Sequence, residues 1–161
     1  MNAAIATFTP FELVTEEQFD ATFNTNAKGP FFLIQKLLPV LKDGSSIVLN
    51  GSIVAHTGNP ATSVYSATKA AINSFTKTLS RDLLPRKIRV NTVNPGPIET
   101  PGLGKIGVPV EELKKGLATQ VPLGRIGRAD EITGYVAFLL SDKSTFILGT
   151  ELSIDGGVSQ L

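Results

Sequence analysis

Cysteine is absent from this 161-residue sequence, and histidine occurs once, as His56. Without cysteine, disulfide bonds, thiolate catalysis and cysteine-based zinc sites are excluded. A single histidine argues against a histidine-rich metal site and against a Ser/His/Asp triad. No metal site is predicted, and the chemistry is expected to come from other side chains.

Charge is scarce and nearly balanced, with 15 Lys and Arg against 14 Asp and Glu, a net charge of +1. A nucleic-acid-binding surface needs a clear basic excess, so a nucleic-acid partner is not expected. Long apolar runs are also lacking, since no stretch approaches about 18 uninterrupted apolar residues. Residues 1–10 contain no Lys or Arg ahead of an apolar run. We therefore expect no membrane association and a cytoplasmic location.

What is present suits a folded core, because 42% of the residues are hydrophobic. The length predicts a single domain over residues 1–161. Runs rich in β-branched residues predict strands at 46–50, 88–93 and 151–154. Helical spacing predicts helices at 16–23, 27–41, 64–84, 109–119 and from 129 to about 140. Strands alternating with helices predict an α/β fold with a parallel sheet.

Local signals refine these boundaries. Thr15 and Gln18 predict a capping box at the first helix, and Gly29-Pro30 predicts a break or a kink in the helical run that follows. The segment 94–109 is rich in Gly and Pro and is expected to be an irregular, functional loop. The nine phenylalanines follow helical spacing and are expected in the core.

Tyr65 and Lys69 lie four residues apart, and so on one face of the predicted helix. A nearby ammonium favours a phenolate, which would lower the tyrosine pKa from about 10 towards the range of a general acid or base. Ser52 follows the strand at 46–50, at the edge where open α/β sheets bind ligands. A solvated Tyr/Lys pair and an ordinary turn serine are the simpler interpretations.

The order Gly51-Ser52, Tyr65 thirteen positions later (65 − 52) and Lys69 resembles the Ser…Tyr-x-x-x-Lys signature of the short-chain dehydrogenase/reductase family. Further similar motifs occur in family order at Asn24–Gly29, Asn94–Thr100, Pro122–Arg125 and Gly149–Gly157. The resemblance implies a Rossmann-like, doubly wound parallel sheet. This chain would hold its C-terminal part, about three strands with flanking helices.

The resemblance also implies a reaction, reversible hydride transfer between a nicotinamide and the carbonyl or alcohol carbon of a small molecule. Tyr65 would exchange a proton with the substrate oxygen, and Ser52 would hydrogen-bond that oxygen. Lys69 would lower the pKa of Tyr65 and bind the nicotinamide ribose, while Asn26 would hold a water linking Lys69 to solvent. Without the family, Asn26 is better interpreted as a helix-interior polar residue bonding its own backbone.

The residues implied to bind the cofactor, NAD or NADP, are Tyr65, Lys69, Pro95, Gly96, Ile98 and Thr100. The loop at 94–119 would cover the substrate and set its identity, which the sequence does not reveal. His56 follows Ser52 by four positions and is either an ordinary loop residue or a substrate-lining one.

The family's Gly-rich cofactor turn has no counterpart in the expected place, and Met1-Asn2-Ala3-Ala4 resembles a motif that lies well after that turn. The adenine-side site and the side chains that choose between NAD and NADP would thus lie outside this sequence. The run Gly102–Gly107 has the spacing of a phosphate-binding turn, but it follows three prolines rather than a strand. The alternative function is a non-catalytic truncated fragment, or an interaction module that needs a partner chain.

Assembly is expected as a homodimer or homotetramer, with the helices at 27–41 and 64–84 paired across a two-fold axis, as the family implies. Small residues on the second helix suit close approach: Ala67, Ala70, Ala71 and Ser74. The strand at 46–50 is expected to expose a flat apolar edge and to make the isolated chain poorly soluble. The isolated chain is also expected to bind a dinucleotide weakly.

Overall fold

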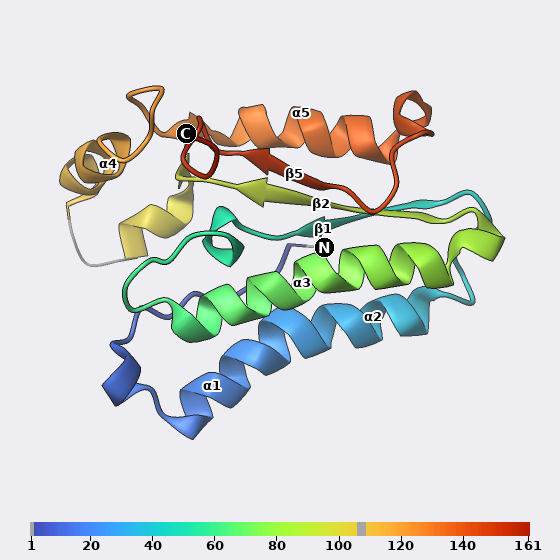
Figure 1. The fold of residues 1–161 in the computed structure, drawn as a ribbon, viewed down its shortest axis with the longest axis horizontal. Coiled ribbons are helices and arrows are strands. Elements are labelled where there is room, and N and C mark those ends of the chain that lie inside the picture. Colours follow the sequence, from blue (N-terminus) through green and yellow to red (C-terminus); the bar gives the residue numbers. More distant parts are fainter. Residues whose placement is uncertain (1, 106–108) are drawn as a thin grey trace.

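The computed structural model describes residues 2–105 and 109–161. It has a parallel sheet with helices on both faces, which confirms the predicted α/β class (Figure 1). The helices and strands in chain order are α1 (Glu16–Phe23), a π-helical segment (Asn24–Lys28), α2 (Gly29–Leu37), β1 (Ser46–Asn50), α3 (Ser63–Asp82), β2 (Arg89–Pro95), β3 (Ile98–Glu99), α4 (Val110–Ala118), β4 (Gly127–Arg128), α5 (Ala129–Leu140) and β5 (Glu151–Ile154). Short 3₁₀ segments are η1 (Phe11–Leu13), η3 (Ile53–Ala55), η4 (Leu84–Arg86), η5 (Pro101–Lys105) and η6 (Asp142–Ser144).

The main sheet has the strand order β1-β2-β5, and both pairings are parallel. Its register places Leu49 opposite Thr92, and Thr92 opposite Glu151. Because the strands are parallel, their carboxyl ends meet at one edge of the sheet. The first turn of α3 and the first turn of α5 lie at this same edge (Figure 1).

Alternating side chains of β1 divide the core between two layers. Ile47 and Leu49 pack in a cluster that includes Ile34 of α2 and Ile72 of α3, whereas Val48 packs in a second cluster with Leu139 of α5. β1 is the edge strand of this sheet, but these three strand side chains are buried. Among the described residues, β1 therefore has a neighbouring strand on one side only, as predicted, while α2, α3 and α5 cover the two faces that carry its apolar side chains.

The helical run is not broken at Gly29-Pro30, so of the predicted break or kink the break is wrong. Gly29 keeps helical angles, and the π-helical segment joins α1 directly to α2. Pro30 lies in the first turn of α2, where a missing N–H is tolerated. The helix instead ends at Leu37, shortly before Pro39, rather than at the predicted residue 41.

The start of α1 carries half of the predicted capping box. The Thr15 hydroxyl accepts a hydrogen bond from the Gln18 backbone N–H at 3.2 Å, as predicted. The Gln18 side-chain oxygen has no hydrogen-bond partner within the described residues, so the reciprocal bond is not formed.

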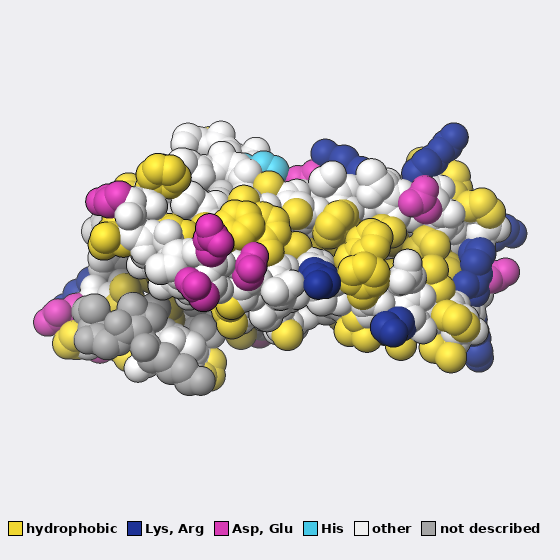
Figure 2. Space-filling view, turned by 90° about the horizontal axis from the view of Figure 1, so that it is seen from below, with side chains coloured by type: hydrophobic (Ala, Val, Ile, Leu, Met, Phe, Trp, Pro, Cys, Tyr) yellow, Lys and Arg dark blue, Asp and Glu magenta, His cyan; other side chains and the backbone are white. Residues whose placement is uncertain are grey.

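None of the nine phenylalanines is fully buried, so the assignment of all nine to the core is wrong, although Phe75 packs against the core cluster that contains Ile34 and Ile72. Phe31 and Phe75 contact each other between α2 and α3, with ring centres 5.1 Å apart, and are half-buried. The exposed ones are Phe8, Phe11, Phe19, Phe32, Phe138 and Phe146. Seen from below, hydrophobic side chains gather on the outer face of the helical layer (Figure 2). Helical spacing therefore does not distinguish phenylalanines on the outer, solvent-facing side of a helix from those on its inner side.

The Gly/Pro-rich segment 94–109 contains more regular structure than the sequence predicts. β2 continues to Pro95, which pairs with Ile154 of β5, and the next residues form β3, which pairs with β4. η5 follows at Pro101–Lys105. In the described part of the chain, every helix is too short or too polar to span a bilayer.

Candidate active site

Ser52 and Tyr65 lie together where β1 ends and α3 begins. Ser52 caps the 3₁₀ turn η3, and its hydroxyl accepts a hydrogen bond from the Val54 backbone N–H at 3.3 Å. Tyr65 lies in the first turn of α3, and its hydroxyl forms a hydrogen bond with the Ser52 side chain. The strand end and the helix start thus bring two hydroxyl groups into contact.

Lys69 follows one helical turn after Tyr65. Its ammonium lies 5.6 Å from the centre of the Tyr65 ring and donates a hydrogen bond to the Asn50 carbonyl oxygen at 2.8 Å. The side chain is almost fully buried, and this burial lowers the pKa of Lys69 to about 8. A neutral fraction of Lys69 therefore exists close to neutral pH.

The pKa of Tyr65 is raised above its ordinary value rather than lowered. Burial is the larger cause, because it disfavours the charged phenolate, and the hydrogen bond from Ser52 acts in the opposite direction. Lys69 is not among the causes of this shift, so the predicted lowering of the pKa of Tyr65 by Lys69 is not found. At neutral pH the phenol keeps its proton, which is the form that a general acid requires.

Asn26 lies in the π-helical segment and is buried with 2% exposure. Its amide oxygen accepts from the Ile5 backbone N–H at 2.8 Å, and its amide nitrogen donates to the Ile5 carbonyl oxygen at 2.7 Å and to the Thr68 hydroxyl at 3.2 Å. Asn26 therefore binds across to two other segments instead of to its own helix backbone. Through Thr68 it reaches the residue next to Lys69. π-helical turns are frequent at functional sites.

A groove of about 470 Å³ opens beside β1, at the carboxyl edge of the sheet. All four loop residues predicted to bind a cofactor line it: Pro95, Gly96, Ile98 and Thr100. Apolar side chains of the strands and of α5 form the rest of its walls, together with Asn2 and Asn50. Ser52, Tyr65 and Lys69 are not among the residues that line this groove. Its link to them is Asn50, which lines the groove and whose backbone oxygen accepts the hydrogen bond from the Lys69 ammonium.

Two residues of the groove, Gly96 and Asn50, have features that matter for ligand binding. A Cβ on Gly96 would lie 2.6 Å from Asp155 Cβ, so only glycine allows this loop to pass so close to β5. The Asn50 side-chain oxygen is buried and has no hydrogen-bond partner within the described residues. It is an acceptor available to a ligand in the groove.

The described residues of the Gly102–Gly107 run do not line the groove. Residues 102–105 belong to η5, whereas Ile106 and Gly107 lie outside the described residues. The described part follows β3 rather than a long strand, which agrees with its interpretation as a segment that does not bind phosphate.

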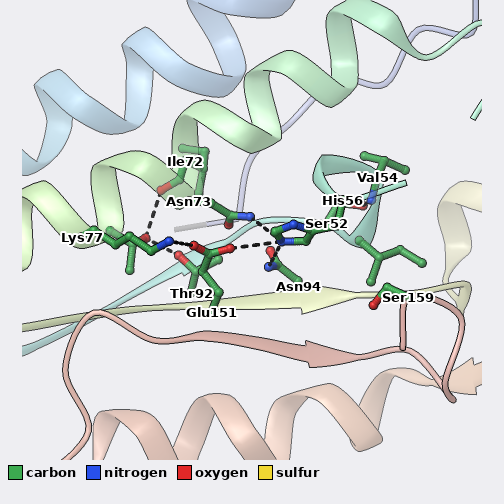
Figure 3. A network of polar contacts seen from close by, with 12 residues as sticks. Ser52, Val54, His56, Ile72, Asn73, Lys77, Thr92, Asn94, Glu151 and Ser159 are labelled. Atoms are coloured by element: carbon green, nitrogen blue, oxygen red, sulfur yellow. Dashed lines mark hydrogen bonds and ion pairs between the residues drawn. The ribbon is translucent and has the colours of Figure 1, made fainter. Parts of the chain in front are cut away.

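Sequence reasoning missed the polar network around His56 (Figure 3). Its ring does not line the groove but contacts Asn73, Asn94 and Glu151, which come from α3, β2 and β5. Spacing along the chain gave no signal for these contacts, because the three partners meet only through the sheet register. The missed Asn50 had a signal, since it ends a strand directly before Gly51-Ser52.

Comparison with known proteins adds independent findings. A family model described as enoyl-(acyl carrier protein) reductase matches residues 1–159. An uncharacterized oxidoreductase of Methylorubrum extorquens is 40% identical over 98% of this chain and 63% of its own length. The 3-oxoacyl-(acyl-carrier-protein) reductase FabG of Thermotoga maritima is 38% identical, with the same 98% and 63% coverage.

The solved structures agree. The angucycline C-6 ketoreductase LanV with bound NADP matches with a TM-score of 0.92 and 32% identity, over 98% of this chain and 60% of LanV. A short chain dehydrogenase family protein from Francisella tularensis matches with a TM-score of 0.91 and 34% identity, over 99% of this chain and 69% of that protein. The chain spans about 63% of the length of the two curated relatives.

Proposed function

Because the chain belongs to the short-chain dehydrogenase/reductase family, we propose that it carries the catalytic group of an NAD(P)-dependent oxidoreductase acting on a carbonyl or alcohol. The observation that carries this proposal is the hydrogen-bonded pair Ser52–Tyr65, with Lys69 one turn away. Lys69 reaches the wall of the neighbouring groove, because its ammonium donates a hydrogen bond to the backbone oxygen of Asn50 there.

The groove fits the nicotinamide end of NAD or NADP. Its walls are mainly apolar, as an aromatic ring requires, and the unpartnered Asn50 oxygen can accept a hydrogen bond from a carboxamide. Pro95, Gly96, Ile98 and Thr100 would hold that end, with Lys69 and Tyr65 on the ribose side. When bound, the reduced cofactor supplies the hydride that the carbonyl carbon receives.

The chain's own residues handle the substrate oxygen and its proton. The Ser52 hydroxyl donates a hydrogen bond to the carbonyl oxygen and holds it near Tyr65. As the carbon is reduced, Tyr65 gives its phenolic proton to that oxygen and becomes a phenolate. The Lys69 ammonium then stabilises this phenolate by charge attraction. In the oxidation of an alcohol, the proton moves in the opposite direction, from the substrate hydroxyl to the Tyr65 phenolate.

Asn26 supports the proton path in this proposal. Both of its amide hydrogens are used, on Ile5 and Thr68, and its oxygen accepts one hydrogen bond from Ile5. An amide oxygen has two lone pairs, so one remains for a water that would connect Lys69 to solvent. Whether or not that water is bound, the Asn26 side chain holds α3 through its hydrogen bond to Thr68.

The test is Tyr65→Phe in a fusion protein. The part of the Thermotoga maritima relative that this chain does not cover is joined to the N-terminal end, and oxidation of NADH and NADPH is followed with a set of ketones and aldehydes. We expect Tyr65→Phe to lower turnover at least about 100-fold, because the proton donor is lost. Cofactor binding, measured by calorimetry, should remain.

Tyr135 provides a matched control, because it is the other of the two tyrosines and lies exposed on α5. Tyr135→Phe should leave turnover unchanged. A Tyr65→Phe protein with near-normal turnover would show that the proton comes from another group. A fusion that binds both cofactors but reduces no carbonyl would favour the non-catalytic alternative.

A further inference from the structure

His56 contacts three other elements from the loop that follows β1 (Figure 3). Its Nε2 lies 3.0 Å from Asn73 Nδ2 on α3, 3.3 Å from Asn94 Nδ2 on β2 and 3.1 Å from Glu151 Oε2 on β5. One ring nitrogen carries either a proton or a lone pair, so Nε2 either donates to Glu151 or accepts from one of the two amides. Lys77 of α3 holds the same carboxylate at 2.7 Å. Asn73 and Asn94 are buried, so these contacts reach from the loop into the layer between α3 and the sheet.

The two amides that contact His56 also contact the beginning of its loop. A Cβ on Gly51 would lie 1.9 Å from Asn94 Oδ1 and 3.0 Å from Asn73 Oδ1, so the Gly51 backbone packs directly against both amide oxygens. The Gly51 N–H also donates to the Val93 carbonyl oxygen at 2.9 Å. Residues 51 and 56 are therefore held at the same place, one on each side of the amide pair.

Ser52 lies between these two fixed points. The turn η3 is only three residues long, and the His56 backbone N–H closes it with a 2.8 Å hydrogen bond to the Ile53 carbonyl oxygen. We propose that His56 is a positioning residue, which holds η3 on Asn73, Asn94 and Glu151 and so keeps the Ser52 hydroxyl against Tyr65. This inference rests on the proposed role of Ser52 in holding the substrate oxygen.

The geometry predicts a signature in the titration of Tyr65. The hydrogen bond from Ser52 lowers the pKa of Tyr65, whereas burial raises it. If removing His56 releases Ser52, the pKa of Tyr65 rises. If removing His56 merely loosens the structure and admits water, the pKa falls. The two roles of His56 therefore shift the titration in opposite directions.

The chain allows this titration to be read directly, because it has two tyrosines and no tryptophan. In a Tyr135→Phe background, the phenolate absorbance reports Tyr65 alone. We expect His56→Ala to raise the pKa of Tyr65 by the same amount as Ser52→Ala. The double variant Ser52→Ala/His56→Ala should titrate like Ser52→Ala, because His56 acts through Ser52.

Rescue and control variants complete the design. His56→Gln should restore the original titration, because a glutamine amide reaches about as far as Nε2 and can either donate to Glu151 or accept from an Asn amide. The shorter His56→Asn should not restore it. Thr57→Ala, in the same loop, should have no effect, because the Thr57 hydroxyl contacts only the Ile53 carbonyl oxygen among the contacts seen.

Three results would overturn the inference: an unchanged or lowered pKa in His56→Ala, an equal further shift in the Ser52→Ala background, or a Ser52→Ala chain that titrates like its parent. None of these measurements needs turnover. Failure here is therefore distinct from failure of the Tyr65→Phe test, which addresses the proposed function itself.

Discussion

Lys69 is a buried cation, and its one hydrogen-bond partner among the residues that the structure describes is a backbone oxygen. Its ammonium donates to the Asn50 carbonyl, and no carboxylate is among the causes that set its pKa. Burial therefore acts without compensation and lowers the pKa of Lys69 from 10.5 to about 8. A protonated lysine in this place therefore costs stability.

This cost has a definite dependence on pH. Below pH 8 the folded and unfolded chains both carry the proton, so the folded state bears the full cost. Between the folded pKa of about 8 and the unfolded value of 10.5, the unfolded chain binds more proton, so stability rises with pH. The gain is at most on the order of 3 kcal/mol.

We predict that Lys69→Met removes this gain. Urea unfolding at pH 7 and pH 10 should show the parent chain gaining stability relative to Lys69→Met over that interval. Lys36→Met, on the exposed side of α2, should follow the parent at both pH values. A difference between the parent and Lys69→Met that stays constant with pH would contradict the assignment.

At the scale of elements, the close approach between the end of β2 and the end of β5 depends on Gly96. A Cβ there would lie 2.6 Å from Asp155 Cβ and 2.7 Å from Asp155 Cα, and the backbone atom cannot turn away. We expect Gly96→Ala to lower the free energy of unfolding by roughly 1–3 kcal/mol. It should also weaken nicotinamide binding, because Gly96 lines the groove.

Gly134 supplies the control for this prediction. It lies inside α5, and a Cβ there meets nothing within 4 Å. Gly134→Ala should therefore raise the free energy of unfolding by about 0.5–1 kcal/mol, because alanine favours the helix. Urea unfolding of both variants tests whether the free energy of unfolding falls in Gly96→Ala and rises in Gly134→Ala. Two changes in the same direction would show that space around the glycine does not decide the outcome.

The elements with strong apolar patterns could be predicted from the sequence. β1 and β5 have the predicted bounds, and α3 and α5 begin and end within two residues of the prediction. The two-residue strands β3 and β4 could not be predicted, because they are too short to show a period. The continuous helix through Gly29-Pro30 was missed because its π-helical turn leaves no trace in apolar spacing.

The site divides in the same way. Ser52, Tyr65 and Lys69 could be predicted because their spacing within one strand–turn–helix unit determines their contact. The face of α3 that meets β2 could not, because it is polar: Asn73, Thr76 and Ser80 are all buried there. Ser80 bonds the Val90 carbonyl oxygen, and Thr76 bonds the Thr92 hydroxyl. Hydrophobic patterning therefore locates α3 but does not show that these polar residues face the sheet.

For the whole molecule, we propose assembly into a homodimer or homotetramer through α2 and α3. Phe32 and Leu33 of α2 are exposed, and Ala70 and Ser74 of α3 present small side chains to solvent. We expect Ala70→Arg to break this interface and so to lower the oligomeric state in sedimentation velocity, because a large charge prevents close helix approach. Thr119→Arg after α4 should not change the assembly. A parent chain that sediments as a monomer would refute the proposal.

The last prediction concerns how the whole chain binds a dinucleotide. Its groove of about 470 Å³ lies in the lower half of the roughly 300–1,000 Å³ range of small-molecule pockets. A dinucleotide has a second nucleotide beyond its nicotinamide end. The cofactor-binding residues proposed here all contact the nicotinamide end and none contacts the second nucleotide. We therefore expect the 161-residue chain alone to bind NADH and NADPH more weakly than micromolar, a free energy short of roughly −8 kcal/mol.

Calorimetric titration of the chain and of the fusion with the Thermotoga maritima segment measures this difference. The fusion should bind more tightly, and Gly96→Ala should weaken its binding, because the nicotinamide end uses the groove in both proteins. Micromolar binding by the chain alone would mean that the described residues supply most of the contacts to the dinucleotide. Tight binding by the fusion that Gly96→Ala leaves unchanged would instead place the nicotinamide away from the groove beside β1.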